Sequence, residues 1–126
     1  MEELKKKLFE IMEKEGLEVN ENTSYFKFLN GKSYYIGGRA YKKYIRIWIK
    51  ARLDLDVEKD FPKDVEEPVY NELHKGYQWI SYDVTNEEEL NKALEVVYKH
   101  PEILMFNLNK LNEPPKIVDV TGQTEE

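Results

Sequence analysis

The stretch from Tyr41 to Asp54, "YKKYIRIWIKARLD", decides the fold because its apolar and polar residues alternate along the chain. Side chains of a β-strand point to opposite faces in turn, so this alternation predicts a strand with two unlike faces. One face carries the apolar residues Ile45, Ile47, Ile49, Ala51 and Leu53. The other carries Tyr44, Arg46, Trp48, Lys50 and Arg52. The strand is therefore expected to bury its first face and to present a basic, aromatic second face.

Further strands are expected on both sides of this one in the sequence. "SYFKFL" alternates around Phe26 and Phe28, and the dipeptide Asn30–Gly31 is a hairpin signal that leads into "KSYYIGG". The pair Gly37–Gly38 permits a bend or bulge before the basic strand. These segments predict a meander of three antiparallel strands, and "YQWISYDV" predicts a fourth strand.

Two amphipathic helices are predicted, one before the strands in the sequence and one after them. The first runs from Glu2 to Glu15 and stops at Gly16, a residue type that suits the left-handed backbone after a helix. The second runs from Asn86 to about Lys99. It follows a capping box formed by Thr85 and Glu88, which marks a helix start.

Shorter segments complete the pass along the chain. The acidic stretch "DLDVEKDFPKDVEEP" is expected to be a loop, and "VYNELHKG" a short helix ending at Gly76. "ILMFNL" after Pro101 alternates like a strand, but we expect a helical turn there. Residues 112–126, "NEPPKIVDVTGQTEE", are expected to form a flexible acidic tail.

Together these elements predict an α+β protein with an antiparallel sheet of four to five strands. The order is helix, three-strand meander, short helix, strand, helix, with the helices packed on one face of the sheet. Residues 1–111 are expected to form a single domain, the usual arrangement for a chain of 126 residues. The predicted core contains Leu4, Leu8, Ile11, Phe26, Phe28, Ile45, Ile47, Ile49, Leu90, Leu94 and Val97.

The residue types available exclude several kinds of chemistry. The chain has no cysteine, so it has no disulfide, thiolate nucleophile or Cys-ligated metal. Its two histidines, His74 and His100, have no partners at the spacing of a triad or a zinc site, and both suit the ends of helices. The acidic run from Asp54 has Lys59 and Val65 where a calcium loop needs Gly and Glu. We therefore predict no catalytic residue, no metal site and no cofactor.

The sequence also bears on location. No apolar run approaches the roughly 18 residues of a membrane span. The start "MEELKKKLFEIMEKEG" is acidic, amphipathic and without a secretory cleavage pattern. We expect a cytoplasmic protein that does not contact membranes.

The charges are distributed very unevenly along the chain. Residues 1–22 hold four Lys and seven Glu, a net charge of -3. Residues 23–53 hold eight basic residues and no acid, a net charge of +8. Residues 54–126 hold seven Lys and eighteen acids, a net charge of -11, which brings the whole chain to -6. Such asymmetry is a property that governs which partners a protein attracts.

The basic block suggests a binding surface, and several interpretations stay open. A row of cations and aromatic rings on a sheet is typical of single-stranded nucleic-acid binding. The candidates for that role are Arg39, Lys42, Lys43, Tyr44, Arg46, Trp48, Lys50 and Arg52. Alternatively, the acidic part of the chain neutralises this face, or the second helix covers Trp48. The same face could also dock an acidic protein partner. A small ligand-binding domain or enzyme would instead need a pocket near His74, Tyr77 and Trp79.

The order of features resembles a small uncharacterised domain found alone or at the C-terminal end of predicted restriction-associated proteins, some labelled "predicted transport protein". The matching pieces are "YFKFLNGKSYYI", "KYIRIWIKA", "DVEEPVYNELHKGYQW" and "VTNEEELNKALEVVYKH". The Gly-His-Trp of that family falls on Gly76, Tyr77 and Trp79, where the His is missing and Gln78 is inserted. More distantly, the chain is similar to YjbR/MmcQ-like proteins. These resemblances imply the architecture above and an expectation of nucleic-acid binding.

Overall fold

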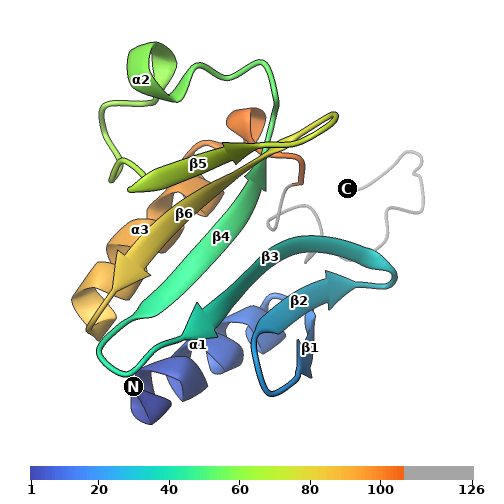
Figure 1. The fold of residues 1–126 in the computed structure, drawn as a ribbon, viewed down its shortest axis with the longest axis vertical. Helices are drawn as coiled ribbons and strands as arrows, with labels where there is room; N and C mark the ends of the chain where they lie inside the picture. The colour runs from blue at the N-terminus through green and yellow to red at the C-terminus, as the bar shows by residue number, and fades with distance from the viewer. Residues whose placement is uncertain (107–126) are drawn as a thin grey trace, which may run out of the picture.

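The protein was analysed as a computed structural model, which describes residues 1–106. Two long helices frame a run of strands, and two short helical turns lie in the connections (Figure 1). The helical elements are α1 (Glu2–Lys14), α2 (Val57–Asp60), α3 (Glu87–Lys99) and the 3₁₀ turn η1 (Pro101–Ile103). The strands are β1 (Glu18–Glu21), β2 (Phe26–Asn30), β3 (Ser33–Ala40), β4 (Ile45–Ala51), β5 (Tyr70–Leu73) and β6 (Gln78–Val84).

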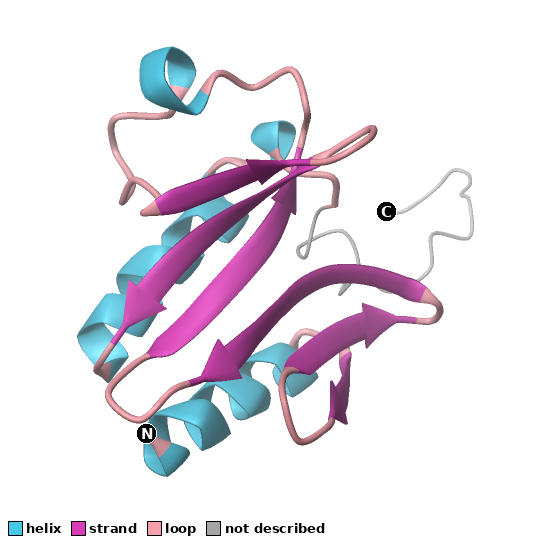
Figure 2. Cartoon of the chain, in the orientation of Figure 1, coloured by secondary structure: helices cyan, strands magenta, loops and turns pink. Residues whose placement is uncertain are grey.

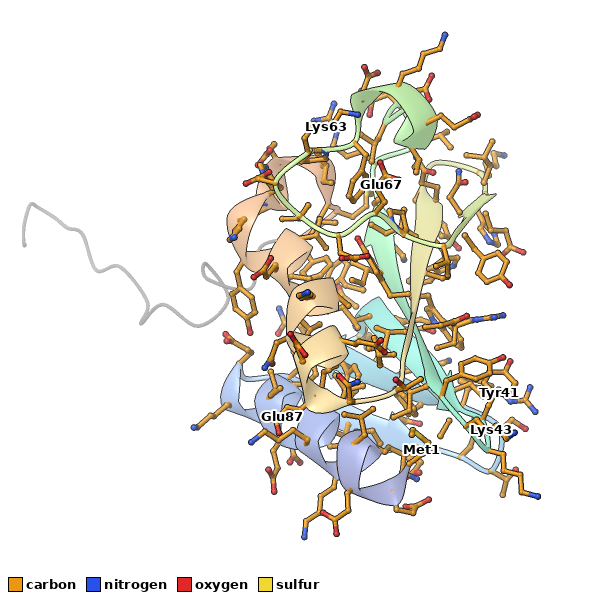
Figure 3. All side chains as sticks on the ribbon, turned by 90° about the vertical axis from the view of Figure 1, so that its left-hand side faces the viewer. Met1, Tyr41, Lys43, Lys63, Glu67 and Glu87 are labelled. Atoms are coloured by element: carbon orange, nitrogen blue, oxygen red, sulfur yellow. The ribbon has the colours of Figure 1, made fainter. Side chains whose placement is uncertain are left out.

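The strands form one antiparallel sheet in the order β1-β2-β3-β4-β6-β5. The α+β class is therefore confirmed, with six strands where four to five were expected. Helices α1 and α3 lie on the same side of the sheet, as Figure 2 shows. In the view turned by 90°, both helices lie to one side of the strands, while the side chains of Tyr41 and Lys43 project from the other side (Figure 3). Among residues 1–106, one face of the sheet is thus covered by helices and the other is open.

The core lies between the helices and the covered face. Strand β4 buries Ile45, Ile47, Ile49 and Ala51, and α3 buries Leu90, Leu94 and Val97 against them. All predicted core residues are buried except Ile11, which is partly buried at the margin of the core. Leu53, expected on the buried face of the basic strand, is exposed because β4 ends at Ala51.

The predicted meander is confirmed as β2, β3 and β4, with differences at its glycines. Asn30 pairs with Ser33, so the two loop residues are Gly31 and Lys32, and Gly31 takes the positive φ of 64°. The sheet irregularity does not lie at Gly37 and Gly38, which are paired with both neighbouring strands. It lies beside Tyr35, because Phe28 pairs with Ile36 while Leu29 pairs with Tyr34.

The segment "VYNELHKG" is not a helix. Tyr70–Leu73 forms the edge strand β5, paired with β6, and the connecting turn contains Gly76 with φ 91°. Pairing with β6 satisfies the backbone of this short segment, whereas a helix of two turns without a buried face is only marginally stable. The helix interpretation was therefore wrong, and His74 lies in a hairpin instead of at a helix end.

Local details differ from the expectations at three further places, and the helical turn expected after Pro101 is confirmed as η1. Strand β1 was not predicted, and the acidic loop contains the short helix α2, capped by Asp56. The N-cap of α3 is Asn86, whose side chain accepts from the Glu89 amide, so the cap lies one residue later than the expected Thr85, and the Glu89 carboxylate accepts from Thr85. After the single turn η1, Leu104 forms an isolated bridge with Ala51. The remainder of the predicted domain, 107–111, and the predicted tail, 112–126, lie outside the described residues.

Candidate functional site

The open face of the sheet has a regular arrangement of side chains that follows from its register. Gly37 lies opposite Trp48, Trp48 opposite Ser81, and Ser81 opposite Tyr70. In the next row, Lys50 lies opposite Trp79 and Trp79 opposite Glu72. In the first row, large rings therefore alternate with small residues across four strands, and in the second a ring lies between two charged residues.

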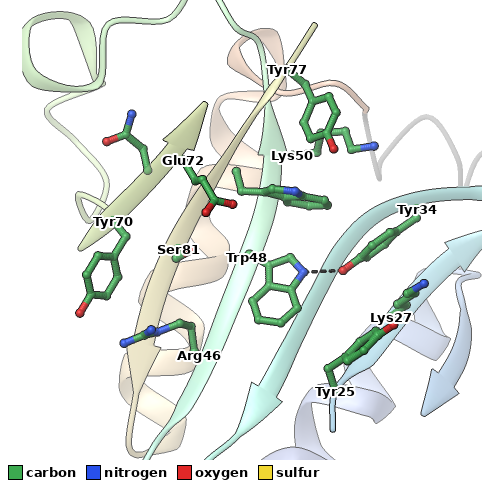
Figure 4. Close-up of a pocket in the computed structure, with 12 residues that line it drawn as sticks. Tyr25, Lys27, Tyr34, Arg46, Trp48, Lys50, Tyr70, Glu72, Tyr77 and Ser81 are labelled. Atoms are coloured by element: carbon green, nitrogen blue, oxygen red, sulfur yellow. Dashed lines mark hydrogen bonds between the residues drawn. The ribbon is translucent and has the colours of Figure 1, made fainter. Parts of the chain in front are cut away.

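This arrangement leaves a hollow of about 690 Å³ on the open face (Figure 4). Its volume falls within the roughly 300–1,000 Å³ of typical ligand pockets. The residues that line it are Tyr25, Lys27, Tyr34, Arg46, Trp48, Lys50, Tyr70, Asn71, Glu72, Tyr77, Trp79 and Ser81. Six of these twelve are aromatic and three are cationic, so the hollow combines stacking surfaces with positive charge.

Trp48 is held in a fixed orientation over β3. Its indole Nε1 donates a hydrogen bond of 2.5 Å to the hydroxyl of Tyr34. A Cβ atom on Gly37 would lie 2.7 Å from that nitrogen and 2.5 Å from the hydroxyl, so only glycine leaves room for this bond. Burial raises the pKa of Tyr34, which keeps its hydroxyl protonated. The indole therefore leans toward β3 and away from Ser81.

Lys50 and Lys27 bring positive charge into the aromatic lining. The Nζ atom of Lys50 lies 4.4 Å from the ring centre of Tyr77 and 5.3 Å from that of Trp79. The Nζ atom of Lys27 lies 5.1 Å from the ring centre of Tyr34. Neither ammonium group has an ion-pair partner within residues 1–106. Both charges are therefore available to an anion.

Arg46 is fixed at one end of the hollow. Its Nε and Nη2 atoms donate to the two carboxylate oxygens of Asp83, at 2.8 and 3.1 Å. The guanidinium lies 4.4 Å from the ring centre of Tyr70. The hydrogen bonds with Asp83 raise the pKa of Arg46 above its already high ordinary value. This fork-to-fork pair leaves Nη1 unused by Asp83.

Ser81 and Glu72 are the polar groups between Trp48 and Tyr70. Ser81 is half-buried on β6, and its hydroxyl makes no hydrogen bond within residues 1–106. Every buried side-chain polar atom in these residues has a hydrogen-bond partner, so the unbonded hydroxyl of Ser81 must be open to solvent. Oε1 of Glu72 accepts a hydrogen bond of 2.7 Å from Nε2 of His74. His74 in turn stacks on Tyr77, with ring centres 5.0 Å apart and planes at 3°. Figure 4 shows Ser81 between Tyr70, Trp48, Arg46 and Glu72.

The structure brings together residues that the sequence assigned to two separate sites. Arg46, Trp48 and Lys50 of the basic strand share the hollow with Tyr77 and Trp79 of the predicted ligand pocket. His74 lies at its border through its contact with Tyr77. The middle of the predicted nucleic-acid face and two residues of the predicted pocket therefore line the same hollow. The alternative in which the second helix covers Trp48 is wrong, because α3 lies on the other face.

The remaining basic candidates lie outside the hollow. The guanidinium of Arg39 lies 5.1 Å from the ring centre of Tyr41, and Tyr44 stacks on the same ring. Lys42 and Lys43 are exposed in the β3–β4 turn. Arg52 was expected on the face of Trp48, but it follows the end of β4. Its side chain bonds to Asp54 and to the carbonyl of Glu102.

Neutralisation of the basic face by the acidic part of the chain is only partial. Asp83 pairs with Arg46 and Asp54 pairs with Arg52. Glu72 is the one carboxylate among the residues that line the hollow. Because Arg46 is paired with Asp83, the two lysines that are unpaired within residues 1–106, Lys27 and Lys50, face the one acid Glu72, and the hollow stays positive.

Sequence reasoning missed the residues contributed by the flanking strands. Tyr34, Lys27 and Tyr25 come from the first hairpin, and Tyr70, Glu72 and Ser81 from β5 and β6. The alternation of Tyr25 and Lys27 with buried Phe26 and Phe28 was a usable signal for part of this set. For Tyr70 and Glu72 there was no such signal in the sequence, because their segment was predicted to be a helix.

Comparisons with known proteins give no assignment. No protein-family model, curated protein or solved structure matches the chain. Residues 1–106 contain no group of three or more His, Cys, Asp or Glu placed to hold a metal ion. Among the helices of these residues, none has both the length and the apolarity needed to cross a bilayer.

Proposed function

We propose that the protein is a non-enzymatic binding module that takes single-stranded nucleic acid on the open face of its sheet. The observation that carries the proposal is the hollow itself, where Trp48 and Trp79 stand beside two lysines without carboxylate partners. Stacking of a base on an aromatic ring contributes about 1–3 kcal/mol, and lysines contact the phosphates between bases.

A single strand suits this surface better than a duplex. The two indoles and the rings of Tyr34 and Tyr77 are half-buried in the hollow, and only Tyr25 and Tyr70 among its six rings are exposed. A duplex keeps the flat faces of its bases stacked inside, whereas an unpaired strand can turn them toward aromatic side chains on a sheet. Lys42, Lys43 and Arg39 at the end of the same face extend the positive surface along which a strand can continue.

The non-enzymatic part of the proposal is supported by how the imidazoles are used. His74 is stacked on Tyr77 and bonded to Glu72. His100 is held by Asp64 and Glu102, away from the lining of the hollow. Each histidine thus has a structural partner, and neither faces a hydroxyl nucleophile.

The test is a fluorescence titration of the full chain with single-stranded oligonucleotides at several salt concentrations. The chain has two tryptophans, and both line the hollow, so its tryptophan emission reports on this site. We expect quenching on binding and a loss of affinity as salt rises. Trp48→Phe and Trp79→Phe each leave one reporter and show which ring stacks. Unchanged emission at low salt would refute the proposal.

A second candidate is a protein-interaction module that docks an acidic partner chain. The observation that favours it is the edge strand β5, where Val69, Tyr70 and Leu73 are 56%, 53% and 66% exposed. An extended peptide can add to such an edge through backbone hydrogen bonds and would then lie beside the positive hollow. Binding of an acidic peptide that competes with oligonucleotide and is lost in Leu73→Asp would favour this candidate.

A further inference from the structure

We infer that the hollow holds one base over Ser81 and that the residues around Ser81 select cytosine. This inference rests on the proposed function and adds a base preference to it. It is carried by three polar groups whose order across the sheet matches the hydrogen-bonding edge of cytosine.

The order of these groups follows from the strand register. Ser81 lies opposite both Trp48 on β4 and Tyr70 on β5. Arg46 lies two residues before Trp48, and Glu72 lies two residues after Tyr70. Because side chains two residues apart share a face, Glu72, Ser81 and Arg46 form a diagonal across three strands with Ser81 at its centre. Figure 4 shows this line.

Each member of the diagonal has hydrogen-bonding capacity left. Glu72 uses Oε1 for His74, and its Oε2 has no partner within residues 1–106. The Ser81 hydroxyl has no partner there either. Arg46 uses Nε and Nη2 for Asp83, so its Nη1 can donate. Read from β5 to β4, the line offers an acceptor, a hydroxyl donor and a charged donor.

Cytosine is the base that complements this order. Its edge presents the N4 amino donor, the N3 acceptor and the O2 acceptor in sequence, and carboxylates accept from the cytosine amino group in known complexes. Thymine and uracil place an oxygen acceptor where Glu72 needs a donor. Guanine presents an acceptor followed by two donors, which is the reverse pattern.

There is room for a planar ring at this position. The indole of Trp48 leans toward Tyr34, away from Ser81. Tyr70 stands two strands from Trp48, which corresponds to about 9.5 Å between their strands. A base that contacts one ring on each of its two faces needs about 7–8 Å between the planes of those rings. The position over Ser81 is thus a slot with Trp48 and Tyr70 as walls.

The carboxylate of Glu72 is the feature that points to base recognition. A surface that bound only phosphates would gain nothing from an acid, because the carboxylate repels the backbone. Glu72 is nevertheless the single acid among the lining residues. Placed beside Trp79 and held by His74 through Oε1, it has Oε2 left to accept from a base.

The test compares oligodeoxycytidine and oligothymidine of about eight nucleotides, a length within the usual site size of single-strand binders. Dissociation constants are measured at one salt concentration for the full chain, for Glu72→Gln and for Ser81→Ala. Glu88→Gln, an exposed carboxylate on α3, is the matched control. We expect wild type and control to bind oligodeoxycytidine at least about fivefold more tightly than oligothymidine. The ratio should fall toward unity in Glu72→Gln and Ser81→Ala.

The other outcomes overturn the inference in distinguishable ways. Equal affinity of the wild-type chain for the two oligomers overturns the base preference and leaves the proposed function intact. A preference that survives Glu72→Gln unchanged overturns the assignment to this diagonal. Failure of the wild-type chain to bind either oligomer removes the proposed function and the inference together.

Discussion

The indole nitrogen of Trp48 donates a hydrogen bond of 2.5 Å to the Tyr34 hydroxyl across the bare backbone of Gly37. This contact joins β3 to β4 on the open face and sets the direction of the ring that lies at the centre of the hollow. The strand pairing of Gly37 is regular on both sides, so this glycine does not serve a bend or bulge. It is needed because the Trp48 and Tyr34 side chains approach its backbone closely.

Substitution of Gly37 by Ala is expected to destabilise the fold. The new Cβ would lie 2.5 Å from the Tyr34 hydroxyl and 2.8 Å from the backbone oxygen of Phe26. Overpacking of this kind costs about 1–3 kcal/mol, measured as the free energy of unfolding in urea. Tyr34→Phe removes only the hydrogen bond and should cost about 0.5–1.5 kcal/mol. A Gly37→Ala variant as stable as wild type would show that β3 and β4 are farther apart than described.

Removal of a lysine in the hollow is expected to weaken nucleic-acid binding through charge. For single strands, the slope of log affinity against log salt is about -0.7 per phosphate contacted. Lys50→Ala and Lys27→Ala should each make that slope shallower by about 0.7. Lys6→Ala, an exposed lysine of α1, serves as the control and should leave the slope unchanged. Equal slopes for all three variants would place the bound strand elsewhere.

Gln78 is expected to be important for stability although it lies beside the site. It is fully buried, and its Nε2 donates to the carbonyls of Arg52 and Leu55 at 2.9 and 2.8 Å. Gln78→Leu would remove both hydrogen bonds, at about 0.5–1.5 kcal/mol each. Asn71→Ala is the control, because it removes only the bond from exposed Asn71 to Gln78. If both variants unfold at the same urea concentration, the carbonyls have found other donors.

The stability of the protein should depend on the protonation of His100. Its Nδ1 lies 2.9 Å from Glu102 and its Nε2 lies 2.7 Å from Asp64. The hydrogen bond with Glu102, and then that with Asp64, raise the pKa of His100 above its ordinary value of 6.5. The same bonds lower the pKa values of Glu102 and Asp64. Both contacts are therefore complete between about pH 4.5 and 6.5, where His100 is protonated and the two carboxylates are ionised.

The sign of this dependence can be checked by thermal unfolding of wild type and His100→Gln across pH. The contribution of a group with a raised pKa is lost as pH rises through the folded pKa. That of the two carboxylates is lost as pH falls through their lowered values. Wild type should therefore exceed the variant by most at mildly acidic pH, with the gap narrowing above neutrality. A gap that widens toward alkaline pH would contradict the account.

The sheet could be predicted because its central strands bury one face. In β4 each second residue is apolar, so the register of the whole strand is fixed by burial, and β2 and β6 follow the same rule. Strand β5 has no buried residue, so the segment around Tyr70 gave no period of two. Its state is decided by pairing with β6, a long-range contact that local pattern does not reveal.

The site was predictable in its charge and rings but not in its shape. Trp48 and Lys50 lie on the exposed half of an alternating strand, and the acid-free block around them is visible in the sequence. Trp79 lies beside Lys50 because β6, and not β5, is the neighbour of β4 in the sheet, with β5 at the outer edge. This order is not visible in the sequence. Arg52 was misplaced because the strand ends one residue before it, where the chain turns to meet η1.

The most direct test of the central claim is a two-dimensional nitrogen–proton spectrum of the full chain titrated with single-stranded oligonucleotide. The two indole signals of Trp48 and Trp79 report on the hollow, and the backbone amides of α1 and α3 report on the covered face. We predict that both indole signals and the amides around Lys50 and Ser81 shift together while those of the two helices do not. Indole signals that stay in place at saturating oligonucleotide, or shifts confined to the helices, would contradict the account.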